Sequence, residues 1–341
     1  MLQIDFINVG YGDSILARDT EASFSMLVDC GDVHVGQSRP DGLRTAAADY
    51  LRREGVETLD LLVLTHLHLD HAGGLAQLLP GIRVRELWTN YLPPEEAWGK
   101  QLAVPAGWSA GARCLMQSLN IYLEALDRLR AQGTQIRLIQ KTQDSRQLTP
   151  QLNVGIYLEE ARLQRRQAEI WSAALNGTAA GEDLDELDGF INNTSIRLRL
   201  SCAQTEIELP GDVYADCWER HSLSPCTIVK LPHHGHRGAL TPRLLEMLRP
   251  RYAVISVSDN RTDDCPSGEV LALLSERGVR SFFTDAAAPM DEHPVPHSAI
   301  RFEVRQNALS VSEVPGRVES GSADKGALRG ASSPVLLRSG S

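Results

Sequence analysis

Seven consecutive residues contain the side chains that most often hold divalent metal ions in proteins. The sequence THLHLDH occupies positions 65–71, so His66, His68, Asp70 and His71 fall within six positions. Imidazole nitrogen and carboxylate oxygen are the ligands that borderline divalent metals favour. In a tight loop, alternate side chains can leave on the same side, so the first two histidines can share one ion while the last two residues serve a second. This histidine motif predicts a metal site.

Two later segments bring similar side chains to the ends of predicted strands. ELPGD places Asp212 after a glycine, a suitable position for a bridge between two metals. LPHHGH ends another apolar run with His233, His234 and His236. Alone, the first segment is more often a turn and the second is as often structural as metal-binding. Together with the histidine motif, both become candidate ligand segments, with His233 and His234 as alternatives for one position.

The elements around these motifs alternate between strands and helices. An apolar strand at 59–65 runs directly into the histidine motif, a helix follows at 73–79, and the next strand is expected at 82–88. This order is typical of a layered α/β protein, in which the ends of strands hold ligands. The other predicted elements are helices at 43–53 (capped by Asp41), 114–132, 159–171, 242–248 and 267–276, and strands at 2–9, 14–17, 25–28, 135–139, 195–200, 205–209, 227–231, 252–257 and 280–284.

We predict one domain over residues 1–312. Within it, residues 92–190 contain predicted helices and an acidic, glycine-containing loop at 181–189. We interpret part of this segment as an insertion or lid over the site; the alternative is an ordinary peripheral segment. Residues 313–341 are rich in Ser, Gly and Arg with little apolar periodicity, which predicts a disordered tail.

The composition limits the classes of function. A chain of 341 residues with 42% hydrophobic residues can bury a full core, and its formal net charge of -10 argues against a broad basic surface for duplex DNA. Bound metals and local Arg and Lys could still neutralise a phosphate. Six scattered cysteines without a Cys-x-x-Cys pair predict free thiols. No apolar run is long enough for a membrane span and the N-terminus lacks signal character, so we expect a soluble, cytoplasmic protein.

The ordered motifs resemble the metallo-β-lactamase superfamily, and within it the hydrolase domain of ComEC-type DNA-uptake proteins and their stand-alone relatives. The similarity covers about residues 6–285. It rests on six segments in the family's order, which are FINVGYGDS (6–14), LVDCG (27–31), THLHLDHAGG (65–74), NNTS (192–195), LPGD (209–212) and KLPHHG (230–235). The resemblance implies an α/β fold, the metallo-β-lactamase four-layer αβ/βα sandwich, with an inserted helical segment and metals at the edge between the sheets.

The resemblance also implies two divalent ions, zinc or manganese. The ligands that it implies are His66, His68, Asp70, His71 and Asp212, and His233 or His234. The wider superfamily uses a further histidine before the bridging aspartate, but this chain has none between His71 and His221. We therefore predict Asn193 as a substitute ligand and expect one ion to be weakly held.

A metal pair indicates hydrolysis, with a hydroxide that bridges the ions as the expected nucleophile. Asp29 is predicted to orient a ligand histidine. His236 is a predicted proton donor to the leaving oxygen. Lys230 and Arg237 are candidate phosphate contacts, with a solvated surface role as the alternative.

The leading hypothesis is a metal-dependent phosphodiesterase or nuclease that acts on DNA, and its support is the family resemblance. One alternative is a small-molecule phosphodiester or lactone hydrolase, which the acidic composition favours. Another is a partner-regulated effector or scaffold subunit of a bacterial antiviral defence system. Stand-alone relatives occur in such multi-gene systems, so a protein partner is expected in that case.

Overall fold

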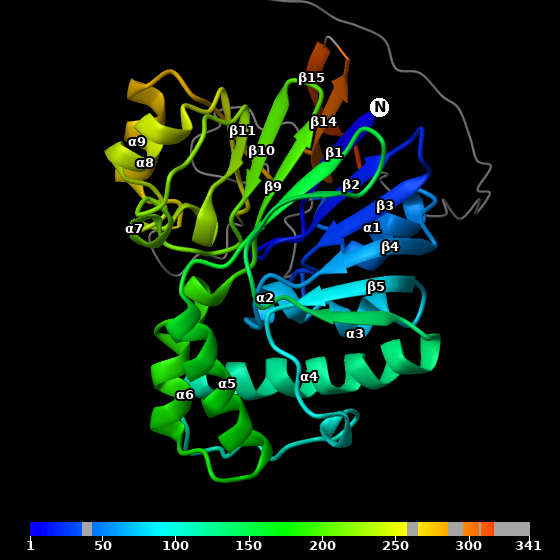
Figure 1. Ribbon diagram of the computed structural model, residues 1–341, viewed down its shortest axis with the longest axis vertical. Coiled ribbons are helices and arrows are strands. Elements are labelled where there is room, and N and C mark those ends of the chain that lie inside the picture. Colours follow the sequence, from blue (N-terminus) through cyan, green and yellow to red (C-terminus); the bar gives the residue numbers. More distant parts are fainter. Residues whose placement is uncertain (36–42, 258–264, 286–295, 307, 317–341) are drawn as a thin grey trace, which may run out of the picture.

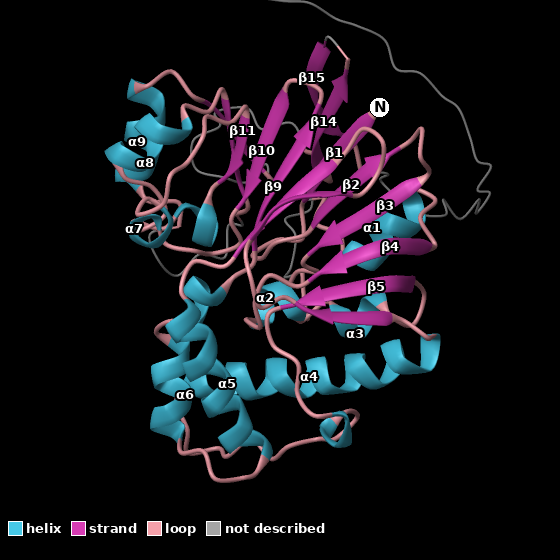
Figure 2. Cartoon of the chain, in the orientation of Figure 1, coloured by secondary structure: helices cyan, strands magenta, loops and turns pink. Residues whose placement is uncertain are grey.

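The computed structural model describes residues 1–35, 43–257, 265–285, 296–306 and 308–316. Its strands form two sheets with helices on their outer sides, as Figures 1 and 2 show. In sheet order, the first sheet contains β15 (Ala308–Val314), β14 (Ala299–Arg305), β1 (Leu2–Ile7), β2 (Ile15–Asp19), β3 (Phe24–Val28), β4 (Thr58–Val63), β5 (Arg83–Thr89) and β6 (Gln135–Leu138). The second contains β13 (Arg280–Phe283), β12 (Tyr252–Ile255), β11 (Ile228–Lys230), β10 (Thr205–Leu209), β9 (Arg197–Cys202), β8 (Asn153–Tyr157) and β7 (Gln143–Gln147).

The helices cover the two outer faces. Those packed on the first sheet are α1 (Ala47–Arg53), α2 (Leu69–Ala72), α3 (Leu75–Leu78) and α4 (Ala110–Gln132), with α5 (Ala161–Leu175) and α6 (Gly181–Asp188) beside α4. Those packed on the second sheet are α7 (Ala215–Trp218), α8 (Pro242–Leu248) and α9 (Gly268–Glu276). Short 3-10 turns lie at Glu95–Ala97, Ile191–Thr194 and Pro232–Gly235.

Apolar side chains on alternate faces of the strands hold these layers together. On β4, Leu61 and Val63 face the second sheet, whereas Leu62 faces the helices. The layer between the sheets includes Phe6 and Phe302, whose rings meet edge to face with centroids 5.9 Å apart. The helix–sheet–sheet–helix order confirms the predicted four-layer αβ/βα sandwich.

Most of residues 92–190 belongs to the body of this fold. Helix α4 buries Leu119 and Leu126 against the first sheet, β6 extends that sheet, and β7 and β8 complete the second. The helical pair α5–α6 is the part that lies outside both sheets (Figure 1). The prediction of a loop at 181–189 is wrong, because Leu184 and Leu187 are buried on one face of α6 and its acidic first turn suits a helix N-terminus.

Several other boundaries differ from the predictions. The sequence pattern missed the five-residue strands β7 and β8, and it missed β14, which pairs with β1, and its neighbour β15. The proposed cap Asp41 and residues 317–341 of the predicted tail lie outside the described residues, and residues 313–314 end β15. None of the six cysteines, all of which are described, forms a disulfide. Among the helices that the structure describes, none combines the length and the apolar character needed to cross a bilayer.

The strand directions bring the predicted motifs to one edge. Strands β3, β4, β5 and β6 run parallel, so their carboxyl ends meet on the same side of the first sheet. Strands β10, β11 and β12 do the same in the second sheet. The histidine motif follows β4, Asp212 follows β10 and the histidine pair follows β11. Residues far apart in sequence therefore converge between the two sheet edges.

Candidate metal centre

The histidine motif turns sharply because two glycines let it approach a neighbouring strand. After β4, the chain forms α2 and then passes Gly73 and Gly74. A Cβ atom on Gly74 would overlap the carbonyl oxygen of Cys30, which follows β3. The same two segments are joined by a hydrogen bond of 2.8 Å, which the Cys30 amide donates to the carbonyl oxygen of His71. This packing fixes the turn that presents Asp70 and His71.

Four ligand side chains from three segments converge at this turn. One ligand atom from each of Asp70, His71, Asp212 and His234 lies within 4.8 Å of the others, and we call this set the four-residue cluster. His234 Nε2 lies 2.9 Å from Asp70 Oδ2 and 3.8 Å from Asp212 Oδ2. His71 Nε2 lies 3.2 Å from Asp212 Oδ2 and 3.7 Å from Asp70 Oδ2. Two ligands of one tetrahedral ion with bonds near 2.1 Å lie about 3.4 Å apart, so these spacings fit a shared ion.

The charges in the cluster also call for a cation. Burial alone lowers the pKa of His71, but Asp212, Asp70 and Asp29 raise it well above its ordinary value. Burial alone raises the pKa of Asp212, but Lys230 and His71 lower it well below its ordinary value. Both pKa shifts have the same cause, which is that the buried carboxylates are stabilised by positive charge beside them. A divalent ion supplies that charge directly.

His66 and His68 form a second pair of imidazoles beside the cluster. His66 Nε2 lies 3.1 Å from His68 Nδ1. The ring centroids of His66 and His71 lie 4.2 Å apart. On its other side, His66 Nδ1 lies 3.1 Å from the hydroxyls of Thr65 and Ser195. Burial first, and then the neighbouring histidines, lower the pKa of His66 well below its ordinary value. The neutral ring can therefore offer Nε2 to a metal.

The structure separates the two histidines that the sequence left as alternatives. Both adopt left-handed backbone angles in the turn after β11, with φ of 47° at His233 and 54° at His234. His234 Nδ1 lies 3.0 Å from the carbonyl oxygen of Ser256, which turns Nε2 toward the cluster. The ring of His233 lies against Tyr214 instead, with centroids 5.2 Å apart. Its backbone amide donates to Asp212 Oδ1 at 2.9 Å.

Lys230 is buried behind Asp212, and its prediction as a phosphate contact is wrong. Its side chain is 0% exposed. The ammonium contacts a carboxylate oxygen of Asp13 and donates to Asp212 Oδ1 at 3.1 Å and to the Gly211 carbonyl at 3.2 Å. Placed there, Lys230 neutralises two buried carboxylates and orients Asp212. The alternative of a solvated surface residue is excluded by the same burial.

The predicted substitute ligand Asn193 is held elsewhere. Its Oδ1 accepts a hydrogen bond of 2.9 Å from the backbone amide of Tyr214, so this oxygen caps the chain after Asp212. By contrast, Asp29 lies where the sequence predicted. Its Oδ2 lies 2.8 Å from His71 Nδ1 while Oδ1 accepts from the Thr65 amide at 2.8 Å, and this pair of contacts holds the His71 ring in place.

His236 and Arg237 lie just beyond the histidine turn. The Gly238 amide donates to His236 Nδ1 at 3.2 Å, so Nε2 is the ring nitrogen that would carry the donated proton. Arg237 is exposed on the surface. Both residues remain predictions in their proposed roles.

Three nearby residues were missed by sequence reasoning. Asp188, at the end of α6, places Oδ1 3.3 Å from His68 Nε2. The ring centroids of Tyr11 and His234 lie 4.3 Å apart. Asp13 forms a second candidate metal-binding group with Asp29 and His71. Tyr11 and Asp13 belong to the glycine-flanked turn after β1, which the pattern assigned only to a hairpin. The acidic run that ends at Asp188 could have indicated a carboxylate near the site, but the sequence pattern predicted a loop there.

The residues present fit a divalent metal pair. Three imidazoles, counting His66, and two carboxylates offer their lone pairs to a common space. His68 Nε2 is buried and makes no well-directed hydrogen bond, although Asp188 Oδ1 lies 3.3 Å away. Such a donor set, with neutral or carboxylate-paired rings and few competing ammonium groups, is the chemistry that zinc and manganese prefer.

Comparison with known proteins gives a family match for one part of the chain. Residues 7–97, which include the histidine motif, match the metallo-beta-lactamase superfamily. This match spans about a quarter of the chain. Proteins of this superfamily are metal-dependent hydrolases, and the candidate ligands of this chain are of the kind that binds divalent ions.

The chain is similar to ComE operon protein 3 of Bacillus subtilis, with 22% identity over 301 residues. The match covers 83% of this chain and 32% of that protein, so the chain spans about a third of the length of its curated relative. Among solved structures, the metallo-beta-lactamase fold protein YhfI from Bacillus subtilis is 12% identical, with a TM-score of 0.47 over 83% of this chain and 96% of its own. Unliganded yeast PDE1 is 12% identical, with a TM-score of 0.42 over 83% and 98%.

Proposed function

We propose that this metal-dependent hydrolase is a phosphodiesterase that acts on nucleic acid, with DNA as the substrate. The observation that carries the proposal is the four-residue cluster, in which Asp70, His71, Asp212 and His234 converge beside the His66–His68 pair. The resemblance to the hydrolase domain of DNA-uptake proteins supports the choice of substrate. The similarity to ComE operon protein 3 is consistent with that resemblance.

The surroundings of the cluster suit hydrolysis of a phosphodiester. Two divalent ions held by these residues would lower the pKa of a bound water and neutralise the charge that develops on the phosphate oxygens. Asp29 orients His71, and Lys230 orients Asp212 from behind. His68 and Asp70 keep 19% and 18% of their side chains exposed, so a substrate reaches the cluster from their side. His236 lies on a partly exposed turn and could protonate the leaving oxygen.

The proposal is tested with bis(p-nitrophenyl) phosphate and with single-stranded and plasmid DNA, each with Mn²⁺, Zn²⁺ or Mg²⁺. We expect metal-dependent cleavage by the wild type. Asp70→Ala combined with His71→Ala should abolish turnover while the circular dichroism spectrum is preserved. The matched control is Asp216→Ala with His221→Ala, because both side chains are exposed and pair with other residues outside the site. Cleavage that survives the first double substitution would exclude this site as the source of activity.

The second candidate is hydrolysis of a small molecule, such as a lactone or a small phosphodiester. The net charge of -10 favours it, because a long polyanion experiences more repulsion than a small substrate. Turnover of a lactone that exceeds turnover of every DNA substrate, with the same loss in the Asp70 and His71 variant, would favour this candidate.

A further inference from the structure

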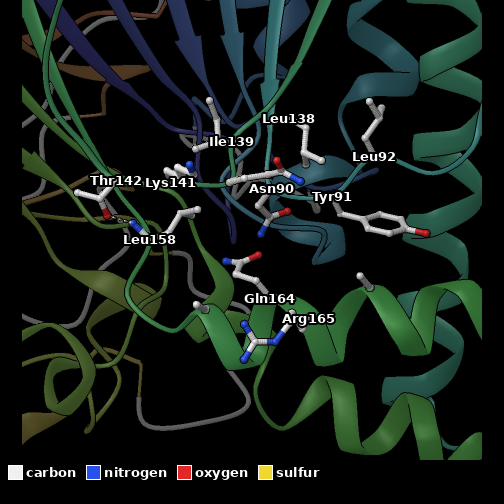
Figure 3. Close-up of a pocket in the computed structure, with 13 residues that line it drawn as sticks. Asn90, Tyr91, Leu92, Leu138, Ile139, Lys141, Thr142, Leu158, Gln164 and Arg165 are labelled. Atoms are coloured by element: carbon white, nitrogen blue, oxygen red, sulfur yellow. Dashed lines mark hydrogen bonds between the residues drawn. The ribbon is translucent and has the colours of Figure 1, made fainter.

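A separate pocket lies at the same sheet edge as the metal centre. It has a volume of about 560 Å³, within the range of sites for small molecules. It lies between the ends of β5 and β6 and the start of α5 (Figure 3). β4 carries the histidine motif, and β5 and β6 are the next two strands. The pocket therefore begins at the strand next to the one that carries the motif.

Two carboxamides at the back of the pocket each leave an oxygen without a partner. Asn90 Nδ2 and Gln164 Nε2 both donate to the carbonyl oxygen of Thr194 at 2.7 Å. Figure 3 shows the two amide groups facing each other inside the pocket. Asn90 is only 7% exposed, and neither Asn90 Oδ1 nor Gln164 Oε1 has a hydrogen-bond partner among the described residues. Both oxygens are buried, so a ligand that offers two N–H donors would satisfy them once the carboxamides rotate toward the cavity.

The side of the pocket near α5 is positively charged. Ala161, the first residue of α5, lines the pocket, and no side chain caps the amides of this 15-residue helix. Such a helix start favours an anion. Lys141 and Arg165 also line the pocket and are exposed. The carboxylate of Glu160, which precedes the helix, lies 3.1 Å from Arg220 and is thus partly neutralised.

The remaining walls are apolar. Leu138, Ile139 and Leu158 line the pocket, together with Tyr91. A flat ring could pack on these side chains while polar groups at its edge reach Asn90 and Gln164. Hence the pocket combines an apolar wall, two hydrogen-bond acceptors and an anion-binding rim. A nucleotide with an amino group on its base has the matching three parts.

We propose that this pocket binds one unpaired nucleotide of the substrate, a role that rests on the proposed nucleic-acid phosphodiesterase activity. The amino group of adenine, cytosine or guanine donates to Asn90 Oδ1 and Gln164 Oε1, and a phosphate lies at Lys141 and the start of α5. Thymine offers one ring N–H and no amino group, so it binds more weakly. Thr194 connects the pocket to the metal centre, because Ser195 follows it and contacts His66.

The test compares cleavage of (dC)₈ and (dT)₈ by the wild type, Gln164→Leu and Lys141→Glu. The control is Arg162→Glu, an exposed residue on the same helix that does not line the pocket. We expect the wild type to have a KM for (dC)₈ about tenfold below that for (dT)₈, the size of one or two net hydrogen bonds. Gln164→Leu should abolish this preference, and Lys141→Glu should raise both KM values. Arg162→Glu should change neither the preference nor, beyond about twofold, the KM values.

Bis(p-nitrophenyl) phosphate separates failure of the pocket from failure of the proposed function, because it has no base. Turnover of this ester should be the same in the Arg162→Glu control and the wild type. If the wild type cleaves no phosphodiester, the proposed function fails, and direct binding of dCMP and dTMP by calorimetry then judges the pocket. Equal affinity for the two nucleotides, or a preference that persists in Gln164→Leu at unchanged melting temperature, would overturn the proposal.

Discussion

Replacing Lys230 with methionine should destabilise the metal-free protein strongly, whereas replacing an exposed lysine should not. The Lys230 ammonium is fully buried, contacts Asp13 and lies 3.1 Å from Asp212 Oδ1. Methionine fills a similar volume but offers no positive charge. Two buried carboxylates would then share the space with no fixed cation behind them.

The magnitude follows from the geometry. At an effective dielectric constant near 20, a pair of unit charges 3.1 Å apart interacts by about 5 kcal/mol. Desolvation of the lysine offsets part of this, and removing one partner of a buried pair typically costs about 3–5 kcal/mol. At about 2 °C per kcal/mol for a chain of this size, the expected fall in melting temperature is about 6–10 °C.

Differential scanning calorimetry of dialysed protein measures this fall. Lys100→Met is the matched control, because Lys100 is exposed, and its melting temperature should stay within about 1 °C of the wild type. Added Zn²⁺ should recover part of the loss in the Lys230 variant, since a cation at Asp212 replaces some of the missing charge. A variant that melts with the wild type in the absence of metal would refute the structural role of Lys230.

Three other predictions concern the metal centre and the pH dependence of folding. His234→Ala should lower the content of bound metal and the turnover at least tenfold, whereas His233→Ala should change the metal content little, because only His234 turns its ring into the four-residue cluster; elemental analysis with kinetics would contradict this if the two variants behaved alike. One metal equivalent should be lost more readily than the other on dialysis, and added Mn²⁺ should raise turnover. The reason is that no histidine between His71 and His221 completes the metal site of His66 and His68. Two tightly held equivalents with no response to added metal would show that another residue completes this site. Burial on its own raises the pKa of Glu54, but Arg301 and Arg18 lower it below 4.5 overall, so its ion pairs stabilise the fold at neutral pH and this stabilisation is lost as the pH falls through the folded-state pKa. Glu54→Gln should therefore lower the melting temperature by about 2–4 °C at pH 7, and a difference that did not shrink below pH 4.5 would argue against this assignment.

The sequence by itself determined the architecture and the place of the metal centre. An apolar strand that ends in THLHLDH encodes its own position, because β4 is buried on both faces and its carboxyl end must lie at the sheet edge. Asp29 was predicted to orient a ligand histidine, and the structure places it on His71. These features depend on local spacing and on apolar periodicity, which are visible in one dimension. The strand β14 was missed because its partner β1 lies at the opposite end of the chain, and β15 pairs only with β14.

Only the tertiary structure decided which neighbouring side chain faces the cluster. His233 and His234 are adjacent and chemically identical, and the contact of His234 Nδ1 with Ser256 turns one ring inward. Lys230 pairs with Asp13 from the turn between β1 and β2 of the other sheet, so nothing in its own segment marks it as buried. Asn193 is likewise used by the backbone of Tyr214. Each of these outcomes is set by a partner 20 or more positions away, and such long-range contacts have no signature in the local sequence.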